Sequence, residues 1–386
     1  MRVRSARRTV SSRSVARSAA AVVIAASALA ACGSEAETSG DEFAFAVVVE
    51  QSGPFAAYGA EVVAGVKAAV KDVNARGDLD VTLKPKFYDC QSDQAICVSQ
   101  VRTAVTADKM PVVLGPTVSV TTLPTAEVTQ QLDVPHLVFS VVPQLTEDYT
   151  NTYRWAASNH DNARASVDYV VGERKAERVA IVHANTEIGQ AAAEDQIAAL
   201  EEYDQKAVAE VAHDPGQKDY TSQLLKLKNA DPDVILSTES DPSDVASLLR
   251  QSKELGIEAT WVGADIAGAT KLAGDAATGY VTYSPWYADN AEDENAAELA
   301  EKLKAEGADN PSWVGAVTYD ATLGLAEVVG QGNVSKDDIA KGLDELADFK
   351  GTAVPSWSFG AKDHDGLDSP TFAEWDGTRY RTVWRP

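Results

Sequence analysis

The chain has 386 residues and contains 34 basic and 58 acidic side chains, which gives it a formal net charge of −24. This acidic excess, with no basic cluster beyond the N-terminus, argues against nucleic acid or an anionic membrane surface as a partner. The length is typical of about two domains, each large enough to bury its own core. After the N-terminus, no apolar stretch is long enough to cross a bilayer.

The N-terminal segment 1–31 has the pattern of a secretory signal peptide. An arginine-rich region precedes small apolar residues, 18–31, which are too few for a permanent membrane anchor. Leu29-Ala30-Ala31-Cys32 resembles the bacterial lipobox, in which the chain is cleaved before the cysteine and its sulfur carries a diacylglycerol; a plain small-residue cleavage site is the alternative. Arg7-Arg8 leaves both the general and the twin-arginine export route open. We expect a lipid anchor on Cys32, a flexible tether over 32–42, and a location on the extracytoplasmic face of the cell membrane.

Two further cysteines, Cys90 and Cys97, lie close together in a chain predicted to be exported. Disulfides form in such oxidising compartments, so we expect a structural bond that closes a small loop. A zinc site is the alternative, but the chain has no second cysteine pair, and its five histidines are scattered.

From Phe43 onward the hydrophobic pattern alternates between strand and helix. Compact apolar runs rich in β-branched residues predict strands, and apolar residues at helical spacing predict helices with one buried face. After the first strand, residues 51–59 form a predicted loop, and the next helix carries valines on one face and stops by Gly77. In this first run the predicted strands are 43–49, 81–88, 112–114 and 135–139, with a second helix over 93–107 and a third that ends near Gln131.

The same alternation repeats after Tyr153. The predicted strands are 178–183, 206–211, 234–237 and 259–262, and the predicted helices are 162–172, 187–203, 220–229 and 245–255. An aromatic, strand-like segment follows at 280–287, and then come helices 291–306, 314–329 and 336–346 and short strands 356–359 and 380–384. Two successive runs of this kind predict an α/β fold of two lobes, each with a mostly parallel sheet.

The turn after strand 112–114 is the most informative local feature. Gly115-Pro116 breaks the strand there, and hydroxyl side chains, Thr117 and Ser119, stand at the start of the next helix. The first turn of a helix has unpaired N–H groups and the positive end of the helix dipole. In open α/β sheets, ligands bind beyond the carboxyl ends of the strands. We therefore predict that this turn binds a carboxylate; the alternative is that Thr117 or Ser119 caps the helix.

Motifs of the common enzyme classes do not occur in the sequence. No Gly-x-Gly-x-x-Gly follows a predicted strand, and no phosphate-binding loop, Gly-x-Ser-x-Gly or His-Glu-x-x-His motif is present. Residues 363–368 are rich in aspartate but lack the oxygen spacing of a calcium loop, so we predict a hairpin turn there. We therefore expect no catalytic residues, no cofactor and no metal, and keep an extracellular hydrolase as an alternative only.

Several short segments, taken in order, carry a family resemblance: Ser52-Gly53-Pro54-Phe55-Ala56-Ala57-Tyr58-Gly59, Phe87-Tyr88-Asp89-Cys90, Gly115-Pro116 through Ser119, Val134-Pro135, Arg178-Val179-Ala180-Ile181-Val182, Asp219-Tyr220-Thr221-Ser222-Gln223-Leu224 and Thr318-Tyr319-Asp320-Ala321. From about Phe43 to Trp384 the chain resembles the branched-chain amino-acid (leucine/isoleucine/valine) binding proteins of ABC importers. The resemblance implies the periplasmic binding protein type I fold, with two Rossmann-like lobes joined by a three-segment hinge. The first lobe would comprise 43–156 and 285–346, and the second 157–284 and 347–386.

The resemblance also implies a function. It implies a monomeric lipoprotein that captures an amino acid or similar small amine-bearing solute between its lobes and delivers it to the permease subunits of an ABC importer. The lobes would close on the ligand by a hinge movement and shield it from water. A sensory module of the same fold, which reports a small amide or metabolite to a membrane partner, is the alternative.

Three residues fall on family positions that contact the ligand. Ser119 falls where the family holds the ligand carboxylate with a serine and backbone N–H groups, in agreement with the turn described above. Asp265 matches the acid that pairs with the ligand ammonium, or else it caps the next helix. Tyr58 matches an aromatic residue that packs against the ligand side chain, or else it belongs to a surface loop.

At other ligand-contacting positions the chain departs from the family. The loop after Ser140 is shorter, Ile188 stands where a tyrosine is usual, and Ser240-Asp241 replaces an aromatic position. Trp313 could supply an aromatic wall late in the chain. Because Glu239, Asp241 and Asp265 would make the rim of the second lobe more acidic, we expect a ligand more polar or more cationic than leucine. The predicted ligand-binding residues are therefore Tyr58, Ser119, Ser140, Ile188, Ser240, Asp241, Asp265 and Trp313.

Overall fold

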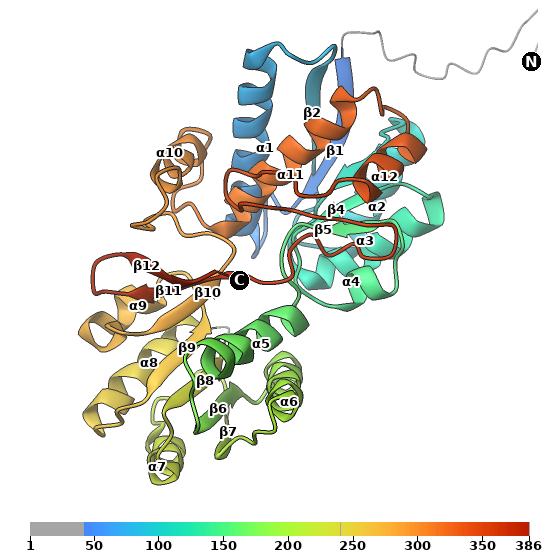
Figure 1. Ribbon diagram of the computed structural model, residues 1–386. Coiled ribbons are helices and arrows are strands. Elements are labelled where there is room, and N and C mark those ends of the chain that lie inside the picture. The colour runs from blue at the N-terminus through green and yellow to red at the C-terminus, as the bar shows by residue number, and fades with distance from the viewer. Residues whose placement is uncertain (1–41, 240, 386) are drawn as a thin grey trace, which may run out of the picture. The chain divides into compact units, whose positions relative to one another are not determined.

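The structure is a computed structural model that describes residues 42–239 and 241–385 (Figure 1). The predicted signal peptide, Cys32 and Ser240 lie outside the described residues. The described chain forms two mostly parallel β-sheets with flanking helices, which confirms the predicted α/β fold of two lobes. Within these residues, no helix combines the length and the hydropathy needed to cross a membrane.

The first sheet has five parallel strands in the order β2-β1-β3-β4-β5. Its apolar strands are buried between helices on both faces, as is usual for parallel sheets. The strands are β1 (Glu42–Val49), β2 (Thr82–Asp89), β3 (Val113–Leu114), β4 (His136–Val138) and β5 (Thr152–Arg154). The helices of this lobe are α1 (Ala56–Arg76), α2 (Gln94–Arg102), α3 (Ser119–Leu132), α4 (Gln144–Glu147), α10 (Ala296–Ala305), α11 (Trp313–Gly330) and α12 (Lys336–Asp344).

The second sheet has seven strands in the order β12-β11-β10-β9-β8-β6-β7. Strands β6 to β10 are parallel, and β11 and β12 add an antiparallel pair at one edge. The strands are β6 (Val179–Ala184), β7 (Ala209–His213), β8 (Val234–Thr238), β9 (Thr260–Ala264), β10 (Val281–Ser284), β11 (Thr371–Trp375) and β12 (Tyr380–Trp384). The helices of this lobe are α5 (Asn159–Val167), α6 (Glu187–Glu202), α7 (Thr221–Ala230), α8 (Pro242–Glu254) and α9 (Ala269–Ala273).

The chain passes between the two sheets three times. It leaves the first sheet after β5, returns after β10 to form α10, α11 and α12, and crosses again to reach β11. The segment after α12 packs with the first lobe, because Trp357 is fully buried against Trp155. In the same segment, the N–H groups of 352–354 donate to the carboxylate of Asp320 on α11. We therefore propose that the first lobe extends to about residue 367, beyond the expected boundary at 346.

Several predicted element boundaries are corrected by the structure. Helix α1 begins at Ala56, so Tyr58 lies in its first turn and not in a loop. Residues 356–359 form no strand and make only the isolated bridge between Phe349 and Trp357. The tight turn predicted over 363–368 lies earlier, at 360–363. Strands β5 and β11 are not predicted from the sequence, since so few residues carry little periodicity.

The predicted disulfide is present in the first lobe. Cys90, directly after β2, is bonded to Cys97 in α2, and both residues are buried. The bond joins the end of a strand to the helix that follows it, so its role is structural.

Candidate ligand-binding site

A cavity of about 370 Å³ is lined by residues of both lobes, a size that suits a small solute. Most lining residues of the second lobe lie at or after the carboxyl ends of β6, β8, β9 and β10, the edge at which open α/β sheets bind ligands, and the others lie on α5 or just before it. Helices α1, α3 and α11 contribute side chains from the first lobe. Apolar side chains cover much of the wall, and the polar lining residues are Ser119, Asn159, Asn162, Thr186, Gln196, Thr238, Glu239, Asp265, Tyr283, Ser284 and Ser312.

The structure brings five of the eight predicted ligand-binding residues to this cavity: Tyr58, Ser119, Ile188, Asp265 and Trp313. Ser140 does not line it, but its Oγ lies 2.9 Å from the Oγ of Ser119. Asp241 is not among the lining residues either, and its carboxylate caps α8 by accepting the N–H of Ser243 at 2.7 Å. Ser240 lies outside the described residues.

Asp265 directly follows β9 and is a half-buried residue of the cavity wall. Its Oδ1 accepts a hydrogen bond from the Tyr380 hydroxyl at 2.7 Å. Burial raises the pKa of Asp265 to about 6; the charge of Asp289 adds to the shift, and the Tyr380 hydrogen bond opposes it. Asp265 does not cap the next helix, because α9 begins at Ala269 after Gly268. The carboxylate therefore remains available to a ligand.

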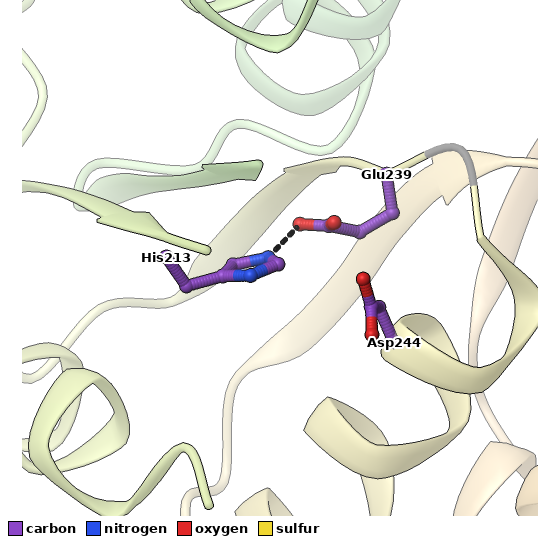
Figure 2. Close-up of side chains that lie close together, drawn as sticks. All are labelled: His213, Glu239 and Asp244. Carbon is purple, nitrogen blue, oxygen red and sulfur yellow. Dashed lines mark hydrogen bonds and ion pairs between the residues drawn. The ribbon is translucent and has the colours of Figure 1, made fainter. Parts of the chain in front are cut away.

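Glu239 follows β8, and Figure 2 shows its hydrogen bond to His213, with Asp244 nearby. Its Oε1 lies 2.9 Å from the Nε2 of His213, whose Nδ1 lies 3.0 Å from the carbonyl oxygen of Asp214. Burial opposes a charge on His213, but the hydrogen bond to Glu239 and its negative charge outweigh burial and raise the pKa of the imidazole. Because a carbonyl accepts only from an N–H group, Nδ1 carries a proton, and the second imidazole nitrogen then shares a proton with Glu239.

The same network contains the one group of side chains in the described residues that could hold a metal ion. The candidate ligand atoms of His213, Glu239 and Asp244 lie within 4.8 Å of one another, and histidine with carboxylates is a common zinc-binding set. Asp244, however, already accepts the N–H of Gly216 at 2.9 Å and the hydroxyl of Tyr220 at 2.7 Å. Both nitrogens of His213 are also engaged. We therefore interpret His213 as the residue that orients Glu239, with Asp244 held nearby by its own partners.

The turn at the start of α3 binds a carboxylate, and that carboxylate belongs to the chain itself. Glu50, directly after β1, is fully buried and accepts the N–H groups of Thr117 at 3.2 Å and Val118 at 3.4 Å and the hydroxyl of Thr121 at 2.6 Å. The alternative of a hydroxyl cap is wrong, because Val118 occupies the N-cap position without a side-chain bond. Glu50 is not among the predicted site residues, although an acidic residue at the end of an apolar strand next to β3 is a signal for it.

Three side chains of the cavity wall carry buried polar atoms that lack a hydrogen-bond partner among the described residues. They are Oε2 of Glu239, Oε1 of Gln196 and Oγ1 of Thr238. A carboxylate oxygen and an amide oxygen can only accept hydrogen bonds, and buried acceptors are normally satisfied. Side chains of the second-lobe wall therefore hold buried acceptors that lack a partner among the described residues.

Two α/β lobes with a shared cavity at the carboxyl ends of their strands define the two-lobed class of solute-binding proteins. The chain belongs to the family described as periplasmic binding protein, whose model matches residues 42–379. This match confirms the resemblance found in the sequence. The names of the relatives, which are leucine/isoleucine/valine-binding proteins, agree with it.

Two curated relatives illustrate the similarity. The Leu/Ile/Val-binding protein homolog 1 of Brucella abortus (strain 2308) is 26% identical over 333 residues, which cover 84% of this chain and 88% of that protein. The Leu/Ile/Val/Thr-binding protein of Salmonella typhimurium is 26% identical over 253 residues, which cover 64% of this chain and 68% of that protein.

Solved structures agree with the fold. A putative branched-chain amino acid ABC transporter protein from Rhodospirillum rubrum aligns with a TM-score of 0.80 at 17% identity, covering 89% of this chain and 100% of that one. A branched-chain amino acid transporter substrate-binding protein from Streptococcus pneumoniae, in complex with isoleucine, aligns with a TM-score of 0.71 at 22% identity. The alignment covers 89% of this chain and 99% of that one.

Proposed function

We propose that the chain is a lipid-anchored, extracytoplasmic solute-binding protein that captures an amino acid or a similar small amine-bearing solute for an ABC importer. The observation that carries this proposal is the charge of the cavity: Asp265 and Glu239 are its charged lining residues within the described chain, and both are acidic. A carboxylate withdrawn from water is the natural partner of an ammonium group. The names of the relatives support a ligand of the amino-acid class.

In this proposal each lobe has a distinct role. Asp265 is the counter-ion of the ligand ammonium, and Glu239 supplies a second acceptor from the same lobe. Ser119, held by Ser140, presents a hydroxyl group from the first lobe. Closure of the lobes would exclude water, strengthen the ion pair and present a closed surface to the permease. The apolar part of the ligand would pack against Tyr58, Ile188 and Trp313.

The proposal is tested by thermal unfolding of the chain from Gly33 onward against amino acids, amines, amides and sugars. A ligand at about a hundred times its dissociation constant should stabilise the fold by roughly 2.7 kcal/mol, which is visible as a rise in Tm. Asp265→Asn should abolish the shift, because it removes the counter-ion and keeps the shape of the side chain. Asp275→Asn, at an exposed aspartate near α9, is the matched control and should keep the shift.

Two results would contradict the proposal. One is a rise in Tm with sugars and with no amine-bearing compound. The other is an amine-dependent shift that survives in Asp265→Asn. Because a purified binding protein can retain its ligand, the protein is unfolded, washed and refolded before the series.

A further inference from the structure

We propose that the ligand carries a cationic amine on an apolar body and has no free carboxylate, so that simple amines bind more tightly than the amino acids from which they differ by that group. This inference rests on the proposed function and narrows its ligand class. Three features of the cavity support it: a turn at the start of α3 that already binds Glu50, the position of Glu50 close to the cavity residue Ser119, and an opposite wall with acceptors and no cationic side chain among the described lining residues.

The first feature is the use of the α3 N-terminus by the protein itself. The helix dipole and free N–H groups of such a turn are what a ligand carboxylate would use. Here Glu50 accepts the N–H groups of Thr117 and Val118 and the hydroxyl of Thr121. Glu50 comes from β1 and is fully buried, so it is a fixed part of the core and not a mobile surface acid. A buried carboxylate of the protein itself therefore already lies at the N-terminal end of α3.

The second feature is the position of Glu50 relative to the cavity. Ser119, which lines the cavity, is the residue next to Val118, whose N–H is bound to Glu50. A ligand carboxylate placed at Ser119 would lie close to a buried like charge. Like charges repel strongly where little water screens them. The Oγ of Ser119 also lies 2.9 Å from the Oγ of Ser140, so this hydroxyl group already has a polar neighbour.

The third feature is the polarity of the opposite wall. Asp265, Oε2 of Glu239 and Oε1 of Gln196 are all acceptors, and the last two lack partners among the described residues. No lysine, arginine or histidine occurs among the described residues that line the cavity, so a ligand carboxylate would find no counter-ion there. An ammonium group has three donors and no acceptor, which matches this wall.

The apolar part of the cavity wall indicates what kind of group the ligand carries besides its amine. Small and aliphatic side chains lie around the acceptors, and two large rings face them from the first lobe. An aliphatic or aromatic hydrocarbon group of modest size suits such a surface. The ligand class that fits these contacts is a primary amine with an apolar chain. The small side chains meant here are those of Ala156, Ala157, Ala163 and Ala192, and the two rings are those of Tyr58 and Trp313.

The test compares compounds that differ at the carboxylate alone. Isothermal titration calorimetry would measure leucine against 3-methylbutylamine and leucinamide, and phenylalanine against phenethylamine. We expect the amine or amide to bind at least about tenfold more tightly than its parent amino acid, which equals roughly 1.4 kcal/mol. This comparison uses the unmodified chain and does not depend on the folding of any variant.

A variant then assigns the effect to Glu50. Glu50→Gln keeps the shape of the side chain and removes its charge, so the preference for the amine should fall by about tenfold in favour of the amino acid. Glu127→Gln, at an exposed glutamate on the same helix α3, is the matched control and should leave the preference unchanged. Circular dichroism melting identifies a variant that fails to fold.

The outcomes separate this inference from the proposed function. If an amino acid binds as tightly as its amine or more tightly, the inference is overturned and the proposed function stands. If no amine-bearing compound of the series binds, both are overturned. If the amine is preferred and folded Glu50→Gln keeps the same preference, the role of Glu50 is refuted, and the selectivity belongs to the wall of the second lobe alone.

Discussion

Three acidic residues near the cavity illustrate how the surroundings of a side chain decide its role. The carboxylate of Glu50 accepts hydrogen bonds from backbone N–H groups of its own lobe. One carboxylate oxygen of Glu239 is hydrogen-bonded to His213, and the other has no partner among the described residues. Asp265 lines the cavity and accepts a hydrogen bond from Tyr380 at one of its two oxygens. A carboxylate thus binds the turn before α3 in Glu50, pairs with a histidine in Glu239, and is the proposed counter-ion of a ligand in Asp265.

The raised pKa of Asp265 predicts how ligand affinity depends on pH. A cationic ligand binds the ionised carboxylate, and with a pKa of about 6 this form is nearly complete at pH 8 and about one tenth of the total at pH 5. We therefore expect affinity for a cationic amine to fall about tenfold between pH 8 and pH 5. Calorimetric titration at intervals across this range measures the effect.

The control for this prediction is the neutral variant. Asp265→Asn should bind weakly and with a dissociation constant that no longer changes over the same pH interval. A pH dependence that persists in the variant would place the titrating group in the His213–Glu239 pair, which also borders the cavity, and would contradict the role given to Asp265.

Among the helices, the pairing of α1 and α11 most directly positions the first-lobe wall. Tyr58 lies in the first turn of α1, and Trp313 is the first residue of α11. The helices approach closely where Gly65 meets Gly315 and Thr318, since a Cβ at Gly65 would lie only 2.9 Å from the Cβ of Thr318. The lack of a side chain at Gly65 therefore sets the spacing of both cavity-lining aromatic residues.

This close approach predicts a large cost for one added methyl group. Gly65→Ala should force the two helices apart and lower the free energy of unfolding by about 1–3 kcal/mol, the usual range for overpacking. Gly360→Ala is the control, because a Cβ there meets open space, and it should change the free energy by less than about 0.5 kcal/mol. Urea denaturation followed by circular dichroism measures both; equal stabilities for the two variants would show that the helices can separate at little cost.

For the whole molecule, the arrangement is that of two lobes with separate cores and three chain crossings. The residues that line the cavity come from both lobes, so relative movement of the lobes would open or close it. The proposed lipid anchor would keep this acidic protein at the membrane surface, near its permease, without any contact between the lobes and lipid.

The proposed anchor predicts the location of the protein in a cell. When the full chain is expressed in a bacterium, it should incorporate labelled fatty acid and sediment with membranes. Cys32→Ser should lose the label and move to the soluble extracytoplasmic fraction, because no sulfur remains to carry the diacylglycerol. The Cys90→Ser/Cys97→Ser double variant should stay with the membranes, and membrane association of unlabelled Cys32→Ser would contradict the anchor.

The sequence by itself determined the class of fold and the positions of most elements. Apolar runs at 43–49 and 234–237 and helical periodicity at 245–255 are local patterns, and they match β1, β8 and α8 closely. The turn at Gly115-Pro116 was predicted to bind the carboxylate of a ligand, because the N–H groups at a helix start follow from the local backbone; the carboxylate that the structure places there is that of Glu50. The proximity of Cys90 and Cys97 in the sequence was sufficient to predict their bond.

Only the tertiary structure decided which groups meet. Glu50 reaches the α3 turn from 67 residues away, because β1 and β3 are neighbours in the sheet and end at the same edge. Asp241 caps its own helix while Glu239, two positions earlier, lines the cavity, since Asp241 directly precedes α8 and Glu239 directly follows β8. Hydrophobic periodicity reports burial and spacing along the chain, whereas a binding site depends on which side chains face each other across it.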